Sequence, residues 1–376
     1  MCNKVDITIN KQFQFLDVLK AVGNITLTCV GLCFFATSAL AKQPLFKNDT
    51  PLDAVLRIPL AQAYNQKDED TRLYLDGNFS FKEANDEIVR IPLKVKTRGN
   101  YRRAHCSLPP LRLNFPKKTV KNTLFHGQDK MKLVGPCQPG GIYKDLVGLE
   151  FLAYQIFETV SDYALETRPM SLSYVDLDKK VKPRTTSAFV IEDISDLAKR
   201  KNLRAIVPEK ALRSELDLNE TALLEIFELF IANNDYSTLI GMPGDMCCHN
   251  VRMLAPKKKA TGAAAEQKLI PVPYDFDMSG LVDAPYAAPP GTLPIRKVRQ
   301  RYFNGLCKDD QYFQAAIEKF RVKKPEIMAL VDDSDLIGSS MKKKTRAFFE
   351  DFYEMVNEPS RYEKEIVGRC RGTTAS

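Results

Sequence analysis

The fold of this 376-residue chain is decided by two stretches, NNDYSTLIGMPGDMCCHNVRML at residues 233–254 and LIPVPYDFDMSG at residues 269–280. Each contains a short apolar run of strand length, at residues 251–254 in the first and 269–272 in the second. The insert between the two runs is rich in Lys, Ala and Gly and has no hydrophobic periodicity. We therefore expect an antiparallel β-hairpin with the insert at its tip.

The base of this expected hairpin carries polar side chains from both strands. If Leu254 pairs with Leu269, then Asn250 lies opposite Pro273 and about two residues from Asp275. Asn and Asp are also common turn formers at the ends of buried strands, so the pattern fits a turn without chemistry equally well. The chemical interpretation predicts that the two side chains share one ligand.

A third polar position, Asp235, follows a strongly apolar segment that predicts a buried helix. Asn250, Asp275 and Asp277 offer the hard oxygen ligands that Mg²⁺ or Mn²⁺ prefers. A separate carboxylate at Asp235 is suited to orient an attacking hydroxyl, so the set predicts phosphoryl transfer. Asp245 is an alternative to Asp235, and the sequence does not choose between Asp275 and Asp277.

Composition sets broad limits on the class of protein. The chain is 44% hydrophobic, which is enough for one large domain or two lobes. Its 55 Lys and Arg residues against 47 Asp and Glu residues give a formal net charge of +8, spread along the chain. This balance suits phosphate-bearing ligands or an anionic surface. No basic-aromatic tract typical of a nucleic-acid-binding module is visible, so we expect no nucleic-acid partner.

The N-terminal segment predicts export. Three lysines precede an apolar stretch at residues 25–41, which ends in Ala-Leu-Ala before Lys42. This pattern is typical of a signal peptide spanning residues 1–41, although a retained anchor is the alternative. We expect a periplasmic or secreted protein with no transmembrane segment after cleavage.

Six cysteines follow residue 41, an even number that indicates disulfides in an exported protein. Pairing within each half of the chain is the simplest expectation. The first half holds Cys106 and Cys137, and the second holds Cys247, Cys248, Cys307 and Cys370.

The hydrophobic pattern changes near residue 192. Residues 42–192 predict a β-rich N-lobe, and residues 193–376 predict a mainly helical C-lobe that carries the hairpin. The expected class is α+β, with the bilobal layout of protein-kinase-like folds and a ligand site between the lobes. The expected strands are 55–60, 73–76, 79–82, 88–96, 111–115, 131–134, 170–175 and 188–191, with a turn at Asp76-Gly77-Asn78; the expected helices are 143–163, 193–201, 208–215, 220–232, 310–322, 324–332 and 339–357.

Basic residues in the β-rich part are candidates for phosphate contacts. Lys132 lies in a short strand, as does the lysine that binds nucleotide phosphates in kinases, although a strand lysine is usually a solvent-facing residue. Glu150, on the following helix, is a candidate partner for Lys132; Glu158 is its competitor, and a third alternative is that neither pairs with Lys132. Arg98 precedes Gly99, which would let the backbone approach a phosphate; an ordinary β-turn is the alternative.

These motifs resemble the spore-coat-protein-H (CotH) kinase family over roughly residues 88–285. Residues 97–100 and the strand LRLNF are similar to its arginine-glycine-asparagine motif, and residues 130–134 to its lysine strand. Asn234-Asp235, Asn250 and Asp275-Phe276-Asp277 look like its Asn-x-Asp, Asn and Asp-x-Asp elements. The gap from Asp235 to Asn250 is long for a catalytic loop, and Phe276 is followed by Asp where many kinases have Gly.

The resemblance implies an atypical protein-kinase-like fold that binds ATP with Mg²⁺ or Mn²⁺ and phosphorylates protein hydroxyls. A non-catalytic envelope or surface protein on the same scaffold is the alternative, because a bacterial periplasm supplies no ATP. Transfer of a nucleotidyl group is a third interpretation, and the sequence does not indicate the oligomeric state. Carried over by residue, the family implies that Lys132 and Arg98 contact the nucleotide, Glu150 supports Lys132, Asp235 is catalytic, and Asn250 with Asp275 or Asp277 holds the metal.

Overall fold

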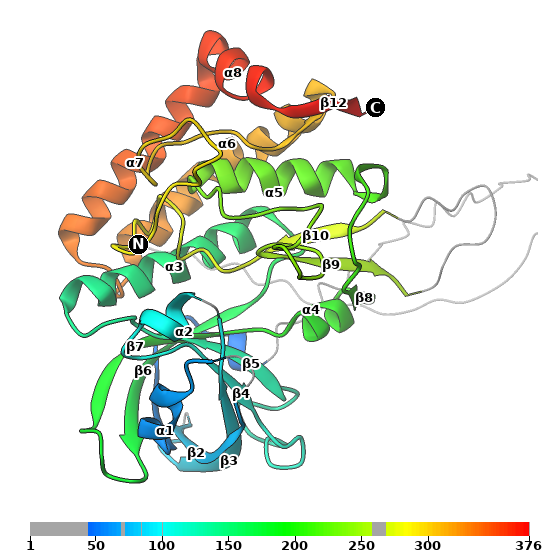
Figure 1. The fold of residues 1–376 in the computed structure, drawn as a ribbon. Helices are drawn as coiled ribbons and strands as arrows, with labels where there is room; N and C mark the ends of the chain where they lie inside the picture. The colour runs from blue at the N-terminus through cyan, green and yellow to red at the C-terminus, as the bar shows by residue number, and fades with distance from the viewer. Residues whose placement is uncertain (1–43, 69–71, 84, 100, 258–267, 376) are drawn as a thin grey trace, which may run out of the picture. The chain divides into compact units, whose positions relative to one another are not determined.

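The computed structural model of this chain describes residues 44–375, with gaps at residues 69–71, 84, 100 and 258–267. The signal peptide expected at residues 1–41 lies outside the described residues. Helices and strands are mixed as expected for the α+β class, with a seven-stranded barrel followed by a helical region (Figure 1).

The barrel forms because alternate residues of its strands are apolar and point inward. In β3, Ile91, Leu93 and Val95 are buried, while their neighbours face outward. Phenylalanines such as Phe79 and Phe115 fill the interior. The strands pair in the order β1-β2-β3-β4-β5-β7-β6, and a parallel β1–β6 pair closes the barrel. Their bounds are β1 (Leu52–Ile58), β2 (Leu75–Lys82), β3 (Ile88–Thr97), β4 (Leu111–Asn114), β5 (Lys130–Val134), β6 (Thr167–Asp176) and β7 (Arg184–Ile191).

One predicted turn in the barrel is wrong. Asp76-Gly77-Asn78 does not separate two strands but lies inside β2, paired on both sides. A Cβ atom at Gly77 would lie 2.5 Å from both the carbonyl oxygen of Arg57 and a side-chain carbon of Ile58. The glycine is therefore used for close approach to β1 and not for a turn.

The helical region follows β7 and packs around the apolar helix α5. The helix predicted at residues 208–215 is wrong, because the backbone there bonds to the later loop at Leu239 and Cys247, leaving only a 3₁₀ turn at Arg213–Glu215. The two helices predicted at 310–332 are one, which continues past Pro325. The helices are α1 (Leu60–Asn65), α2 (Tyr101–His105), α3 (Gly141–Val160), α4 (Ile194–Arg200), α5 (Leu218–Phe230), α6 (Asp310–Asp333), α7 (Ser339–Asn357) and α8 (Pro359–Glu365).

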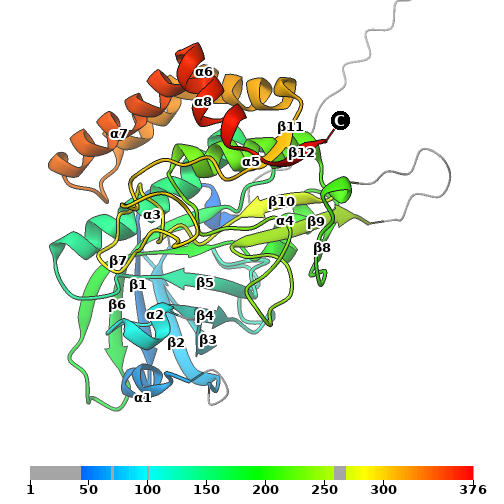
Figure 2. The same ribbon diagram turned by 45° about the horizontal axis from the view of Figure 1, so that its top comes forward.

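The hairpin exists, with its register shifted by one residue from the prediction. Leu254 lies opposite Ile270, not Leu269. Leu269 instead pairs with Leu216, and its N–H donates to the carbonyl of Glu215 at 2.6 Å. The strands β9 (Val251–Pro256) and β10 (Ile270–Pro273) form a sheet with β8 (Leu203–Ile206), shown in Figure 2, and β11 (Leu306–Lys308) pairs with β12 (Arg371–Ala375).

Three disulfides confirm the prediction that the six cysteines after residue 41 are oxidised and that each pairs within its own half of the chain. They join Cys106 to Cys137, Cys247 to Cys248, and Cys307 to Cys370. Disulfides of this kind are typical of proteins from oxidising compartments. None of the helices in the described part of the chain has the length and apolar character needed to cross a membrane.

The end of β6 allows a prediction of pH dependence. The Asp176 carboxylate accepts hydrogen bonds from the N–H groups of Leu60 at 2.8 Å, Lys180 at 2.8 Å and Val181 at 3.0 Å. Burial raises the pKa of Asp176, but these donors outweigh it and lower the pKa overall. A lowered folded-state pKa stabilises the protein above the ordinary Asp value of about 3.9, and this contribution is lost as the pH falls through the folded-state pKa.

We therefore expect Asp176→Ala to lower the free energy of unfolding by about 1–3 kcal/mol at neutral pH. Urea unfolding at several pH values checks this. The difference between wild type and variant should shrink below the ordinary Asp pKa, and a difference independent of pH would contradict the role of the ionised carboxylate.

Candidate active site

Three cations from separate elements converge where the barrel faces the hairpin. Arg98 follows β3, Lys132 lies on β5, and Arg252 lies on β9. The Lys132 Nζ lies 3.5 Å from the ring centroid of Tyr274, and the Arg252 guanidinium lies 4.5 Å from the same centroid. The Arg98 Nη1 lies 4.0 Å from Oδ1 of Asp275, the residue after Tyr274. Both parts of the fold thus contribute charge to one place.

The electrostatics of this cluster favour an added anion. Burial and then the charges of Arg98 and Arg252 lower the pKa of Lys132, while Asp275 opposes them. Burial raises the pKa of Asp275, but Arg98 and the other nearby cations bring it below its ordinary value, so its carboxylate is ionised. The Arg98 Nε and Nη2 are buried and have no hydrogen-bond partner among the described residues. Two carboxylates, Asp275 and Asp193, act on Lys132 against the charges of Arg98 and Arg252, so the cluster keeps positive charge for a ligand to neutralise.

Asp235, His249 and Asn250 form a second group on the hairpin side. Asp235 Oδ1 lies 2.7 Å from His249 Nε2, and Asn250 Nδ2 donates to Asp235 Oδ2 at 3.0 Å. The hydrogen bond to Asp235 raises the pKa of His249 above its ordinary value. The Asp235 side chain is 38% exposed and thus accessible from solvent. His249 and Asn250 contact Asp235 and not the exposed alternative, Asp245.

The sequence prediction that Asn250 and Asp275 lie together is confirmed, although the register differs. The Tyr274 N–H donates to the Asn250 carbonyl at 3.0 Å, which places Asp275 one residue beyond this bond. Both Asn250 (φ 51°) and Asp275 (φ 68°) adopt the left-handed backbone conformation that Asn and Asp tolerate best. The Asp275 N–H lies 2.9 Å from the Tyr154 hydroxyl of α3, which fixes this turn against the helix.

A buried chain of hydrogen bonds positions Asp235. Asn233 Nδ2 donates to Glu228 Oε2 at 2.8 Å, and the Asp235 N–H donates to Asn233 Oδ1 at 3.1 Å. Burial raises the pKa of Glu228 well above its ordinary value, which favours the neutral acid at the end of α5. The sequence analysis did not find Glu228, because α5 also carries Glu220 and Glu225 and the spacing of the three does not single out Glu228.

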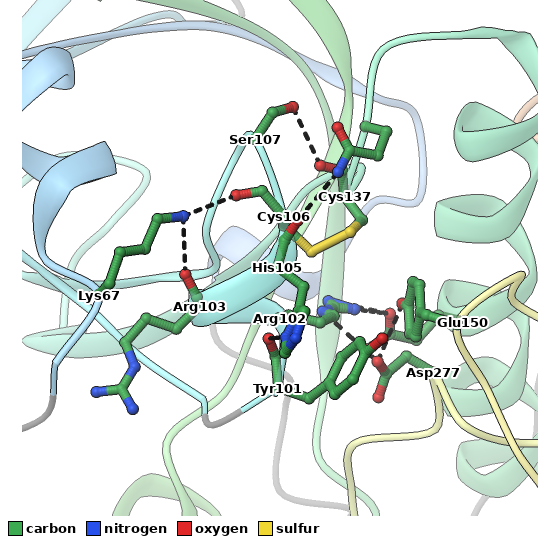
Figure 3. The surroundings of a disulfide bond; sticks show 12 residues. Lys67, Tyr101, Arg102, Arg103, His105, Cys106, Ser107, Cys137, Glu150 and Asp277 are labelled. Atoms are coloured by element: carbon green, nitrogen blue, oxygen red, sulfur yellow. Dashed lines mark hydrogen bonds and ion pairs between the residues drawn. A yellow bond between two sulfur atoms is a disulfide. The ribbon is translucent and has the colours of Figure 1, made fainter.

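Glu150 does not pair with Lys132, the candidate partner that the sequence suggested, but with Arg102. Arg102 Nη1 donates to Glu150 Oε2 at 2.9 Å, and Arg102 Nε lies 3.6 Å from Asp277 Oδ2 (Figure 3). Tyr286 also donates to Asp277 Oδ2 at 3.0 Å. The competitor Glu158 acts electrostatically on Arg200. Arg102 therefore joins α3 to the segment after the hairpin.

The two acidic residues of the Asp-Phe-Asp motif lie in different surroundings. The Asp277 side chain is 10% exposed and bound by Arg102 and Tyr286, whereas that of Asp275 is 29% exposed. Burial raises the pKa of Asp277, although Arg102 opposes it. Asp275 is thus the more accessible and the more readily ionised of the two.

Arg102 is positioned by the short helix α2. The Cys106–Cys137 disulfide ties the end of α2 to the segment before α3, and Lys67 Nζ donates to the carbonyls of Arg103 and Cys106 at 3.1 and 3.2 Å. Figure 3 shows Arg102 extending from α2 toward Glu150 and Asp277. A five-residue helix is too short to be stable alone, so these contacts hold it.

We expect the double variant Cys106→Ser/Cys137→Ser to lose about 2–4 kcal/mol of stability and to release Arg102 from Glu150. The variant Cys307→Ser/Cys370→Ser is a matched control, because it removes a disulfide distant in sequence from α2. Chemical denaturation should show a loss of stability in both double variants. Hydrogen exchange should show faster opening of residues 101–105 only in the first, and equal protection there in both variants would contradict the positioning role.

The side chains of this site can hold a metal ion only together with oxygen atoms of a bound substrate. No three His, Cys, Asp or Glu side chains lie together as a ready metal site in the part of the chain that the structure describes. Asn250 donates its Nδ2 to Asp235, which leaves its Oδ1 as a possible metal-binding atom on the same hairpin as the ionised carboxylate of Asp275. Such a sparse oxygen set is typical of Mg²⁺ bound jointly by one or two side chains and substrate phosphates.

The sequence analysis missed Arg102, Arg252, His249 and the three tyrosines of the site, Tyr154, Tyr274 and Tyr286. Among 55 basic residues, only Arg98 and Lys132 were marked by a neighbouring pattern. His249 carried a signal, since it directly precedes Asn250. Comparison of this chain with models of protein families, with curated proteins and with solved structures finds no match in any of the three.

Proposed function

We propose that this protein is an exported, kinase-like phosphotransferase that uses ATP with Mg²⁺ or Mn²⁺ and acts on a protein hydroxyl. The observation that carries the proposal is the convergence of Arg98, Lys132 and Arg252 around the ionised Asp275. A triphosphate is the ligand that best satisfies three cations beside a single metal-binding carboxylate. The three disulfides support an oxidising compartment outside the cytosol.

The order of the elements supports a kinase-like bilobal arrangement. Strand β5 carries Lys132 and is followed directly by α3, which carries Glu150 and Tyr154 to the site. The β9–β10 hairpin brings Asn250 and Asp275 from the helical region to face that strand. Kinases also place a strand lysine, a helix glutamate and two metal ligands around a nucleotide. In this chain Arg102, not the lysine, contacts the glutamate.

The roles of the side chains follow from their contacts. Lys132, Arg98 and Arg252 would neutralise the phosphates and hold them in line with the acceptor. Asp235, the most exposed acid of the group, would accept the proton of the acceptor hydroxyl, while His249 and Asn250 hold its carboxylate in place. Asp275 and the Oδ1 of Asn250 would hold the metal, which supplies charge neutralisation at the phosphates. Asp277 would act through Arg102.

Thermal unfolding with and without ATP tests the proposal. Ligand binding to the folded state at a hundredfold excess over Kd stabilises it by about 2.7 kcal/mol, so the melting temperature should rise with ATP and Mg²⁺ or Mn²⁺ together. Incubation with a protein acceptor and ATP labelled at the γ- or the α-phosphate then separates phosphoryl from nucleotidyl transfer. No shift at millimolar ATP would overturn the proposal and favour a non-catalytic scaffold.

A further inference from the structure

A cavity of about 510 Å³ lies apart from the candidate active site. The start of α3, the strands β6 and β7, and the connection between α6 and α7 form its walls. No residue assigned above to the active site lines it. Its volume is within the range of roughly 300–1,000 Å³ that is usual for small-molecule sites.

Two cations in the wall of this cavity have no acidic partner. Neither Lys144, near the start of α3, nor Arg184, at the start of β7, makes an ion pair within the described residues. Arg184 Nη2 donates only to the Gln138 carbonyl, at 3.4 Å. The neighbouring carboxylate of Asp145 is already used, since its Oδ1 accepts from the Gly338 N–H at 2.9 Å. Two cations are thus available to an anionic group in the cavity.

Part of the remaining wall is polar in a way that suits hydroxyl groups, beside the apolar Pro51, Met170 and Leu336. Ser171, Thr185, Thr186 and Ser187 line the cavity along β6 and β7, and Asp335 lines it from the α6–α7 connection. The Thr185 hydroxyl is hydrogen-bonded to that of Ser173 at 2.6 Å. Asp335 likewise makes no ion pair with the residues that the structure describes. A carboxylate and several hydroxyls together are suited to pair with the hydroxyls of a sugar ring.

The walls are preformed and not easily collapsed. A Cβ atom at Gly148 of α3 would lie 2.6 Å from a side-chain carbon of Ile337 and 2.7 Å from the Leu336 carbonyl oxygen. The α6–α7 connection is therefore packed directly on α3, and the Asp145–Gly338 hydrogen bond fixes it beside the cavity. A fixed frame of this kind spares a ligand the cost of ordering its site.

From the two unpaired cations and the carboxylate and hydroxyls that line the same cavity, we infer that it binds an anionic saccharide, a sugar that carries a phosphate, sulfate or carboxylate group. The cations hold the acidic group, and Asp335 with the strand hydroxyls holds the ring. This inference does not depend on the proposed phosphotransferase activity.

Isothermal titration of the full chain with glucose 6-phosphate, glucose 6-sulfate, glucuronate and inorganic phosphate tests it. Arg184→Gln and Lys144→Gln should each weaken binding about tenfold or more, as expected for a lost charge-assisted hydrogen bond. Lys182→Gln, an exposed lysine between the same two strands, is the matched control and should change little. The sugar series shows which acidic group is preferred.

Further variants separate this cavity from the active site. Lys132→Met should leave sugar binding unchanged, and Asp335→Asn should weaken binding of the sugars but not of inorganic phosphate. Loss of binding in Lys132→Met with retention in Arg184→Gln would place the ligand in the active site and overturn the inference. The inference would also fail if inorganic phosphate bound as tightly as the sugar anions, or if none of the four compounds bound at millimolar concentration.

Discussion

Replacing Asp275 with Asn should abolish the metal-dependent part of ATP binding. Mutation of residues that only support a metal ligand typically costs 10–100-fold in affinity, so loss of a direct ligand should cost at least about 100-fold. The change also removes the negative charge of Asp275, which offsets part of the positive charge of Arg98, Lys132 and Arg252. Metal-free ATP should therefore bind the variant as tightly as it binds wild type, or more tightly. This opposite response of the two nucleotide forms distinguishes a metal ligand from a residue needed for folding.

Titration with ATP in the presence of Mg²⁺ and in the presence of a chelator measures both forms. Asp245→Asn is the matched control, because Asp245 is exposed on the loop that precedes His249. Asp277→Asn should lower nucleotide affinity less, since Asp277 is bound by Arg102 and Tyr286. If Asp277→Asn alone removed the metal dependence, the roles proposed for Asp275 and Asp277 would be reversed.

Replacing Lys308 with Met should destabilise the protein by about 3–5 kcal/mol, because it leaves a buried carboxylate without its cation. Lys308 donates to Glu225 of α5, and both side chains are only 1% exposed. Glu225 also accepts from the Leu306 N–H at 3.0 Å, so this one carboxylate joins α5 to β11. Gly305 permits the approach, since a Cβ atom there would lie 2.7 Å from Glu225 Oε2.

Unfolding in guanidinium chloride measures the loss of stability in Lys308→Met. The control is Lys324→Met, which breaks a largely exposed pair with Glu350 and should cost less than about 1 kcal/mol. The double variant Glu225→Leu/Lys308→Met should recover much of the stability, because an apolar pair leaves no unpaired charge. Equal losses in Lys308→Met and Lys324→Met would contradict the importance of burial.

Sequence patterns predicted the site best where its geometry depends on residues that are close together in the chain. Asn250 and Asp275 were found because each follows or precedes an apolar run, and a hairpin brings such ends together whichever register it adopts. The register itself was missed by one residue, because Leu269 pairs with Leu216, far away in the sequence. Lys132 was found from the alternation of β5, which requires no knowledge of distant contacts.

The partner of Glu150 could not be predicted in this way. Which strand or loop the Glu150 side chain faces depends on how α3 is rotated against the barrel, and the spacing of apolar residues fixes that rotation only coarsely. Arg102 reaches Glu150 because a disulfide and Lys67 hold α2 in place, and both contacts join residues distant in sequence. Sequence patterns therefore identify the acidic residue but not the cation beside it.

The closure of the barrel by β1 and β6 has a consequence for association with other chains. Within the described residues the barrel has no edge strand, so an extended peptide has no unpaired backbone to join there. In the three-stranded sheet, β10 is an edge, but Pro271 and Pro273 remove two of its N–H donors. The opposite edge, β8, keeps its donors, which makes it the place in that sheet where backbone pairing with another chain is least obstructed.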